Sequence, residues 1–328
     1  MTRVFVTGGT GLLGTDLITM LLERGDQVVG LARCTASEQA LRARGVEVTR
    51  GDVCDQQAMA AGMRGCELAF HVAGVNSFCL ADPAPMLRAN VDGALAAVNA
   101  ARQAGVARLV LTSSAATIGE RAGVVADEHT PHRGHFLSAY ERSKTLGERA
   151  AKRAAGEIGQ DVVYVNPASV QGPGRAGGTG RFLLAFIDGR LKLFVDTYVS
   201  LVDIQDCSAG HLLAAERGAA GERYLLSGIG MTIGEALSLA AAVAGVQRSP
   251  RLAPRPLASA SATVVEYAFR LRGRRPPVCR EMVRTLLRGH HYDGSRAERE
   301  LGLRYTPAAE TLQRTVAWAR AQGLLKNV

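Results

Sequence analysis

The chain has 328 residues, of which 47% are hydrophobic and 21% charged, the composition of an ordinary globular protein. Its formal charge is +9, but nearly all of the basic residues are arginine, a bias typical of a GC-rich genome, so we predict no nucleic-acid partner. No apolar run approaches the roughly 18 residues of a membrane span, and we predict no membrane partner either.

Strands and helices alternate through the first half of the chain. Short runs rich in β-branched residues predict buried strands, and apolar residues at helical spacing predict the helices between them. The predicted strands are Arg3–Thr7, Gln27–Ala32, Val46–Thr49, Glu67–Val72, Arg108–Ser113 and Val162–Asn166, and the predicted helices are Gly11–Arg24, Ser37–Arg44, Gln56–Met63, Pro85–Ala104 and Ser138–Ala155. This order favours an α/β fold, a Rossmann-like doubly wound parallel sheet with right-handed crossovers.

The second half is less regular. The glycine-rich segment 171–180 predicts a loop. After it we expect strands at Ser200–Val202 and Arg223–Leu226 and helices at Arg181–Gly189, Ile233–Ala244, Leu257–Leu271, Arg280–Leu287 and Ala308–Gln322. We assign residues 1–170 to a dinucleotide-binding Rossmann domain, with 196–228 returning to it. Residues 171–195 and 229–328 form a smaller, mainly helical substrate lobe.

One stretch, Arg270-Leu-Arg-Gly-Arg-Arg275, is densely basic. We interpret it as a solvated surface segment, and an anionic partner is the alternative.

Three glycines follow the first strand, at Gly8, Gly11 and Gly14. Glycine permits a tight turn and a close approach of the backbone, and unpaired N–H groups at a helix start favour an anion. Because strand, turn and helix start coincide here, we predict that the loop binds the pyrophosphate of a dinucleotide. The contacts expected from it are Gly8, Thr10, Gly11, Leu12 and Leu13.

The end of the second strand bears on the choice of dinucleotide. An NAD-specific site usually has an acidic residue there, whereas this chain has Arg33. The guanidinium suits a 2′-phosphate, so we predict NADP(H) in preference to NAD(H); an exposed arginine without a role is the alternative. Asp52 and Val53, after the third strand, are placed to reach an adenine edge, although Asp52 also suits an exposed turn.

Tyr140 and Lys144 are four residues apart on a predicted helix and therefore share one face. A neighbouring ammonium should lower the pKa of a phenol, which makes Tyr140 a candidate acid/base. Ser114 follows the strand Arg108–Ser113, at the sheet edge where such folds bind ligands, and is placed to hydrogen-bond a carbonyl. Ser113 is a poorer candidate because adjacent side chains of a strand face opposite ways.

These residues resemble the extended short-chain dehydrogenase/reductase family over nearly the whole chain. The matching segments are Thr7–Gly14, Gly51–Asp55, His71–Gly74, Asn90–Gly93, Leu201–Asp206 and Tyr292–Gly302, together with Ser114, Tyr140 and Lys144. The resemblance implies that Ser114, Tyr140 and Lys144 are catalytic. It also implies cofactor contacts from Val72, Ala73, Gly74, Asn90, Thr112, Tyr140, Lys144, Pro167 and Val170. Asn90 would support a water near Lys144; a helix cap is the alternative.

The implied reaction is hydride transfer between a nicotinamide and a carbonyl carbon. Tyr140 would give a proton to the carbonyl oxygen, Lys144 would bind the nicotinamide ribose, and Ser114 would polarise the carbonyl. The segment Asn166–Pro173 is similar to that of dihydroflavonol-reductase-like enzymes, which favours a ketone or aldehyde reductase. A sugar-nucleotide epimerase or dehydratase using NAD is the alternative, and a non-catalytic NADP-binding regulator is a third interpretation.

The substrate itself is not identified by any motif. Phe78, Phe136 and Phe182 are candidates for an apolar pocket, although each also suits plain packing. Arg175, in the glycine-rich loop, is a candidate for an acidic group on the substrate. His129, His132 and His135 recur every third residue, but a polar loop explains them better than zinc does, and we predict no metal.

The six cysteines form no C-x-x-C pair, and a disulfide framework is not expected in a chain of this length. We therefore predict reduced thiols and a cytoplasmic location. A homodimer formed through the long helices Pro85–Ala104 and Ser138–Ala155 is a further expectation that the family resemblance implies.

Overall fold

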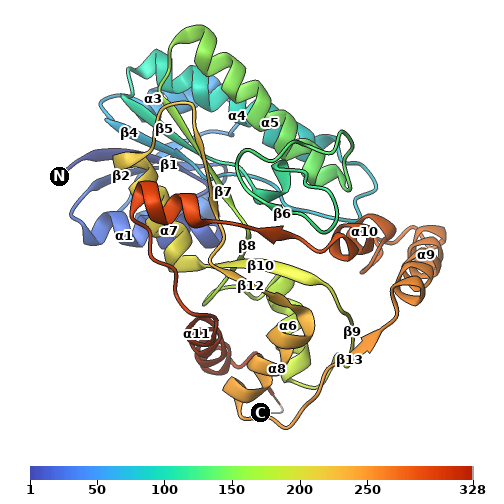
Figure 1. Ribbon diagram of the computed structural model, residues 1–328. Helices are drawn as coiled ribbons and strands as arrows, with labels where there is room; N and C mark the ends of the chain where they lie inside the picture. Colours follow the sequence, from blue (N-terminus) through green and yellow to red (C-terminus); the bar gives the residue numbers. More distant parts are fainter. Residues whose placement is uncertain (327–328) are drawn as a thin grey trace.

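A seven-stranded parallel sheet forms the centre of the computed structural model, which describes residues 1–326 (Figure 1). Its strand order is β11-β7-β5-β4-β1-β2-β3. The strands are β1 (Arg3–Thr7), β2 (Gln27–Ala32), β3 (Glu47–Arg50), β4 (Leu68–His71), β5 (Arg108–Thr112), β7 (Val162–Pro167) and β11 (Arg223–Leu226). Every neighbouring pair is parallel. The predicted doubly wound α/β fold is confirmed.

Helices cover both faces of this sheet because its strands are apolar on both sides. In β1, Val4, Phe5 and Val6 are all fully buried, with Val4 and Val6 in one core and Phe5 in the other. One face carries α1 (Leu12–Glu23) and α7 (Ile204–Arg217); the other carries α3 (Gln56–Met63), α4 (Ala84–Ala104) and α5 (Ala139–Ile158). The remaining helix of this half is α2 (Thr35–Arg42). Two apolar cores thus hold the sheet in place, and with it the edge where its strands end.

A third core lies outside the sheet. It is built from α6 (Thr179–Ile187), α8 (Ile233–Ala244) and α11 (Ala308–Ala321). Two small sheets accompany it: β8 (Ser169–Gln171), β10 (Tyr198–Asp203) and β12 (Ile229–Thr232) form one, and β9 (Leu193–Val195) pairs with β13 (Arg251–Ala253) in the other. Two further helices of this half, α9 (Arg255–Leu271) and α10 (Arg280–Arg288), pack on each other.

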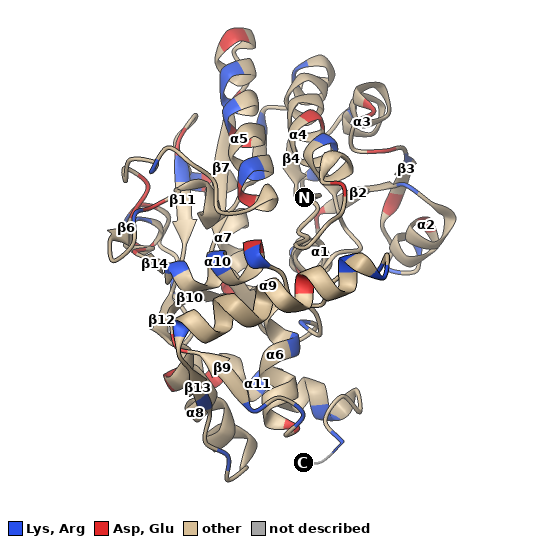
Figure 2. Cartoon of the chain, turned by 90° about the vertical axis from the view of Figure 1, so that its right-hand side faces the viewer, with Lys and Arg blue, Asp and Glu red and all other residues tan. Residues whose placement is uncertain are grey.

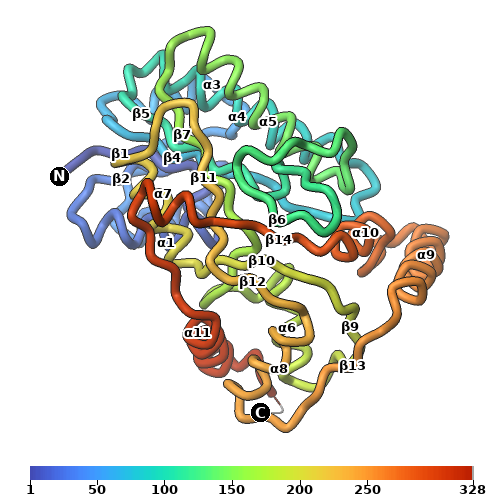
Figure 3. Tube along the Cα trace, viewed as in Figure 1, coloured from blue at the N-terminus to red at the C-terminus, as the bar shows by residue number. Residues whose placement is uncertain are grey.

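The chain returns to the large sheet near its end. Figure 3 shows the orange-to-red trace passing from the lobe through α9 and α10 and back towards α7. There β14 (His291–Tyr292) pairs with β6 (Val125–Ala126), and the π-helical turn Ala297–Leu301 packs into the core shared by α1 and α7. Residues 297–303, which we expected in the substrate lobe, therefore share the core of the sheet. The two-domain division stays a prediction.

Other differences concern short or atypical elements. We predicted no helix at Ile204–Arg217, where α7 lies, because this helix is buried nearly all round and shows no amphipathic stripe. Gln171, which we placed in a loop, ends β8. The strands β9, β12, β13 and β14 have two to four residues each, too short for a periodicity signal.

The cysteine prediction is wrong for one pair. Cys79 and Cys279 form a disulfide, whereas Cys34, Cys54, Cys66 and Cys207 are free. The cytoplasmic location, which rested on six reduced thiols, stays a prediction. Within residues 1–326 no helix is long and apolar enough to cross a membrane.

Candidate active site

The carboxyl ends of the central strands meet at one edge of the sheet, where open α/β sheets bind ligands. Thr7 ends β1 and leads into the glycine loop, and His71 ends β4 and leads into segment 72–75. Thr112 ends β5 and is followed by Ser113 and Ser114. Because all of these strands are parallel neighbours, most of the predicted site residues come to this edge.

The glycine loop is built for close backbone approach. Gly8 has φ +72°, and a Cβ there would lie 2.7 Å from the backbone nitrogen of Ala73. A Cβ on Gly14 would lie 2.2 Å from the carbonyl oxygen of Gly8. At the start of α1, Gly11 offers no side-chain cap and the first turn has no acidic residue. The helix N-terminus keeps unpaired N–H donors, so the loop fits a pyrophosphate.

The ends of β2 and β3, where we expect the adenosine half of the dinucleotide, are followed by Arg33 and Asp52. Arg33 follows β2, is exposed, and its guanidinium makes no hydrogen bond or ion pair within the described residues. Asp52 accepts a hydrogen bond from the backbone of Cys54 at 3.0 Å, which makes it a turn residue, while Val53 lies beneath Gly93. Arg33 is thus free for a phosphate, whereas Asp52 is engaged with Cys54 in the turn after β3.

Asn90 fixes the segment after β4. Its Oδ1 accepts from the backbone N–H of Val75 at 2.8 Å, and its Nδ2 donates to the Val75 carbonyl at 2.9 Å and to Ser143 Oγ at 2.8 Å. The alternative that Asn90 caps a helix is wrong, since it lies well inside α4. A Cβ on Gly74 would lie 3.4 Å from Asn90 Oδ1 and 3.6 Å from Lys144 Nζ. The asparagine therefore positions the backbone that passes over Lys144.

Tyr140 and Lys144 lie in the first two turns of α5, which begins where Ser138 caps the helix by accepting from the N–H of Glu141. The Ser114 hydroxyl lies close enough to the Tyr140 phenol to lower the pKa of that phenol. The Lys144 ammonium donates to the carbonyl oxygen of Thr112 at 2.8 Å. The structure therefore brings together the three residues that the sequence singled out.

The pKa of Tyr140 differs from the value that we expected beside Lys144. Burial raises the pKa of Tyr140 above its ordinary value, and the hydrogen bond from Ser114 and the charge of Arg175 offset this only in part. Burial also lowers the pKa of Lys144 to about 8, against the opposing effect of the Glu148 carboxylate. The prediction that Lys144 lowers the pKa of Tyr140 is wrong, because burial raises this pKa and the groups that oppose the rise are Ser114 and Arg175.

Glu148 is a site residue that the sequence analysis missed. Its Oε2 accepts hydrogen bonds from Ser113 Oγ, from Thr117 Oγ1 at 2.9 Å and from Asn166 Nδ2 at 2.8 Å. Ser113 therefore faces away from Tyr140, as the strand alternation predicted. The position of Glu148 four residues after Lys144 on one helix was the signal that could have found it.

Three other residues that we predicted as cofactor contacts differ in what their side chains contact. The Thr112 hydroxyl pairs with His211 Nε2 at 2.9 Å, so Thr112 offers only its carbonyl, to Lys144. Pro167 is buried at the end of β7. Val170 lies in β8 and packs against the core shared by α1 and α7.

The four candidate substrate residues besides Ser114 are not equivalent. Phe78 packs near Tyr140, with ring centroids 6.2 Å apart. Arg175 is half-buried and close enough for its charge to act on the pKa of Tyr140. In contrast, Phe136 contacts His132 edge-on, and Phe182 lies under the guanidinium of Arg181. Only Phe78 and Arg175 are thus linked to Tyr140 by the structure.

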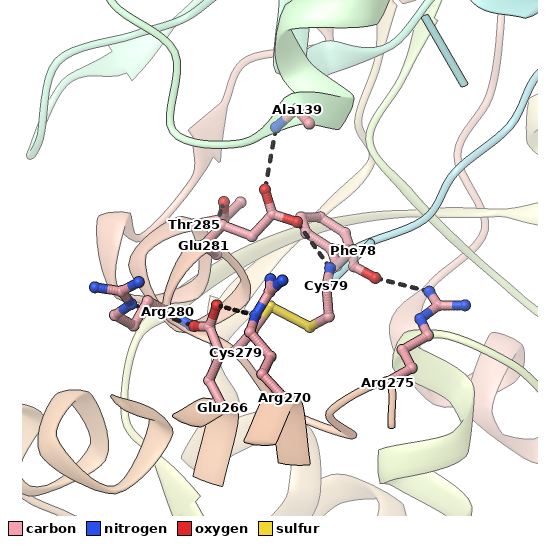
Figure 4. Close-up of a disulfide and its surroundings, with 10 residues drawn as sticks. All are labelled: Phe78, Cys79, Ala139, Glu266, Arg270, Arg275, Cys279, Arg280, Glu281 and Thr285. Carbon is pink, nitrogen blue, oxygen red and sulfur yellow. Dashed lines mark hydrogen bonds and ion pairs between the residues drawn. A yellow bond between two sulfur atoms is a disulfide. The ribbon is translucent and has the colours of Figure 1, made fainter. Parts of the chain in front are cut away.

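Figure 4 shows a second tie to this site, around the disulfide. The Glu281 carboxylate accepts from the backbone N–H of Cys79 at 2.8 Å and from that of Ala139 at 3.2 Å. Arg275 donates to the carbonyl oxygen of Phe78 at 2.7 Å. The segment carrying Phe78 and the start of α5 are thus held together by the α9–α10 region.

The chain is similar to known proteins over most of its length. Residues 4–227 match the NAD dependent epimerase/dehydratase family. Sterol demethylase protein B of Methylococcus capsulatus is 34% identical, over 98% of this chain and 99% of its own. The 4-hydroxy-2-methyl-3-oxo-4-farnesyl-3,4-dihydroquinoline-1-oxide ketoreductase of Stigmatella aurantiaca is 33% identical, over 92% of this chain and 91% of its own. The crystal structure of gox2253 superposes with a TM-score of 0.87 at 31% identity, covering 99% of this chain and all of that one.

Proposed function

The chain belongs to the NAD dependent epimerase/dehydratase family and is an NAD(P)-dependent oxidoreductase, and we propose that it reduces a ketone or aldehyde with Tyr140 as the proton donor. The observation that carries the proposal is the placement of Tyr140, Lys144 and Ser114 at the same sheet edge, with the Ser114 hydroxyl close enough to lower the pKa of the Tyr140 phenol and the Lys144 ammonium fixed on the Thr112 carbonyl. Since burial raises the pKa of Tyr140, the phenol is protonated at neutral pH and can serve as a general acid.

The proposed roles of Ser114, Lys144 and Arg33 follow from the groups that each side chain can bind. A nicotinamide dinucleotide, when bound, supplies the hydride. Ser114 orients the carbonyl oxygen towards the phenol, and Lys144, fixed on the Thr112 carbonyl, keeps two further N–H donors for ribose hydroxyls. The exposed guanidinium of Arg33 supports NADPH, because it is free to pair with a 2′-phosphate.

The substrate we propose is a small molecule with an apolar body. The ring of Phe78 lies against the proton donor. Two relatives are named for a sterol and for a farnesylated dihydroquinoline, both largely apolar. Arg175 is proposed to meet a polar or acidic group of the substrate, since its charge acts on the pKa of Tyr140.

A sugar-nucleotide epimerase or dehydratase is the alternative that the family description keeps open. One observation weighs against it. Asn166 stands where many sugar-nucleotide enzymes have an arginine, and its amide donates inward to Ser114 O, Thr117 Oγ1 and Glu148 Oε2. Its side chain is fully buried and does not reach a substrate.

The deciding experiment measures consumption of NADPH with a panel of ketones, aldehydes and sugar nucleotides. We expect turnover with an apolar ketone or aldehyde and a loss of about 100-fold or more in kcat for Tyr140→Phe. Binding of NADPH should persist in that variant, as judged by quenching of intrinsic fluorescence. Equal activity of Tyr140→Phe, or conversion of a sugar nucleotide without net use of cofactor, would refute the proposal.

A further inference from the structure

The helix α9 turns a row of large apolar side chains towards solvent. Leu257 is 57% exposed, Val264 68%, Tyr267 67% and Leu271 70%. Leu257, Val264 and Leu271 are seven residues apart, and Tyr267 falls between the last two at helical spacing, so all four lie on one face. We call these four residues the α9 stripe.

The opposite face of the helix is already packed. Ala262 and Glu266 are buried. Glu266 pairs with Arg270 at 3.0 Å and with Arg280 of α10 at 3.3 Å, and it accepts from the backbone N–H of Arg280 at 2.9 Å. The α9 stripe therefore points away from the protein, beside a hollow of about 700 Å³ that Val264, Tyr267 and Leu271 help to line.

The flanks of the stripe are strongly positive. Between residues 251 and 280 the only acidic residue is Glu266, which is buried and paired. Figure 2 shows α9 crossing this side of the molecule, tan along most of its length with blue segments towards its ends. The exposed arginines in this part of the chain are Arg251, Arg255, Arg270, Arg272, Arg274, Arg275 and Arg280.

We propose that α9 docks in the plane of an anionic lipid surface. Apolar side chains on one face, flanked by arginines whose stems can bend towards phosphate groups, are the features of a helix that lies in a membrane interface. A second copy of this chain is a poorer occupant because it would bring one arginine cluster against another. The sequence-based expectation of no membrane partner considered only spanning segments, and the basic stretch 270–275 left an anionic partner open.

The docked helix is directly connected to the candidate active site. Arg275, which follows α9, donates to the Phe78 carbonyl, and the Phe78 ring contacts Tyr140. An apolar carbonyl compound dissolved in the membrane would therefore meet the site next to the docking surface. This last step rests on the proposed function, whereas docking itself does not.

Co-sedimentation with vesicles tests the docking. The full chain should bind vesicles of mixed phosphatidylcholine and phosphatidylglycerol, bind pure phosphatidylcholine far more weakly, and be released by high salt. Leu271→Ser and Val264→Ser should each lower the partition coefficient about tenfold, and Arg272→Gln about fivefold. Val125→Ser, which changes a residue 55% exposed in β6, is the matched control and should bind like the parent.

Because the α9 stripe is exposed, these variants should fold and keep their activity towards a water-soluble carbonyl compound, which separates docking from the reaction. Binding that is equal on neutral vesicles, or unchanged in the stripe variants, would overturn the proposal. So would the finding that Leu271→Ser converts a dimer to a monomer without any vesicle binding by the parent. Capture of an acidic protein in place of vesicles would overturn it too.

Discussion

Cys79 is disulfide-bonded to Cys279, 200 positions later in the sequence, and so ties the segment after β4 to the start of α10. The neighbour of Cys79 in the chain is Phe78, whose ring contacts Tyr140. The bond thus connects the proposed proton donor to the part of the molecule that carries the α9 stripe.

Breaking this bond should weaken both the fold and the substrate site. Cys79→Ser or Cys279→Ser should lower the free energy of unfolding by about 2–4 kcal/mol, because the cross-link closes a long loop. The KM for the carbonyl substrate should rise while the KM for the dinucleotide stays unchanged. Denaturant unfolding and steady-state kinetics measure these effects, with Cys34→Ser, an exposed free thiol, as the control. An unfolding free energy and a KM for the carbonyl substrate that both equal those of the parent would contradict the prediction.

Glu281 is expected to act as a positioning residue for the same segment. In Glu281→Gln the single amide oxygen can serve only one of the two N–H groups, of Cys79 and Ala139, that the carboxylate now serves. We expect a loss of about 1–3 kcal/mol in stability and a rise in the KM of the carbonyl substrate that exceeds any fall in kcat. Glu298→Gln, at an exposed position, is the control. If the two variants behave alike, Glu281 has no positioning role.

The buried ammonium of Lys144 should lower the free energy of unfolding at neutral pH. Its pKa is about 8 in the folded protein against 10.5 ordinarily. Between these pH values the unfolded chain binds more protons, so stability increases as pH rises through this window and is lowest below about pH 8. Methionine has no ionisable group, so Lys144→Met removes that dependence. Lys144→Met should therefore lose activity yet show a flatter curve of unfolding free energy from pH 7 to 10.5.

Lys152→Met provides the comparison, because Lys152 is an exposed residue of the same helix. Its curve should follow that of the parent. A Lys144→Met curve as steep as the parent's would show that Lys144 does not titrate in this window.

Arg33 is expected to set the choice of dinucleotide. Arg33→Ala should raise the KM for NADPH about tenfold or more, the value of a lost hydrogen bond between charged groups, and leave the KM for NADH nearly unchanged. Arg64→Ala, at another exposed arginine, is the control. An equal effect on both cofactors would instead place Arg33 outside the cofactor site.

The short-range features were determined by the sequence alone. Gln27–Ala32, Gln56–Met63, Arg223–Leu226 and Ile233–Ala244 were predicted with the bounds that the structure has, because periodicity and local turn residues fix such elements. Tyr140 and Lys144 were found in the same way, since one helix sets their spacing.

Only the tertiary structure decided the long-range relationships. The pairing of Cys79 with Cys279, the two N–H groups shared by Glu281, and the exposure of the α9 stripe depend on how segments far apart in sequence pack together. The pKa of Tyr140 belongs here as well. The sequence showed the neighbouring ammonium, but the burial that raises this pKa, and the approach of Arg175 that opposes the rise, are properties of the folded chain.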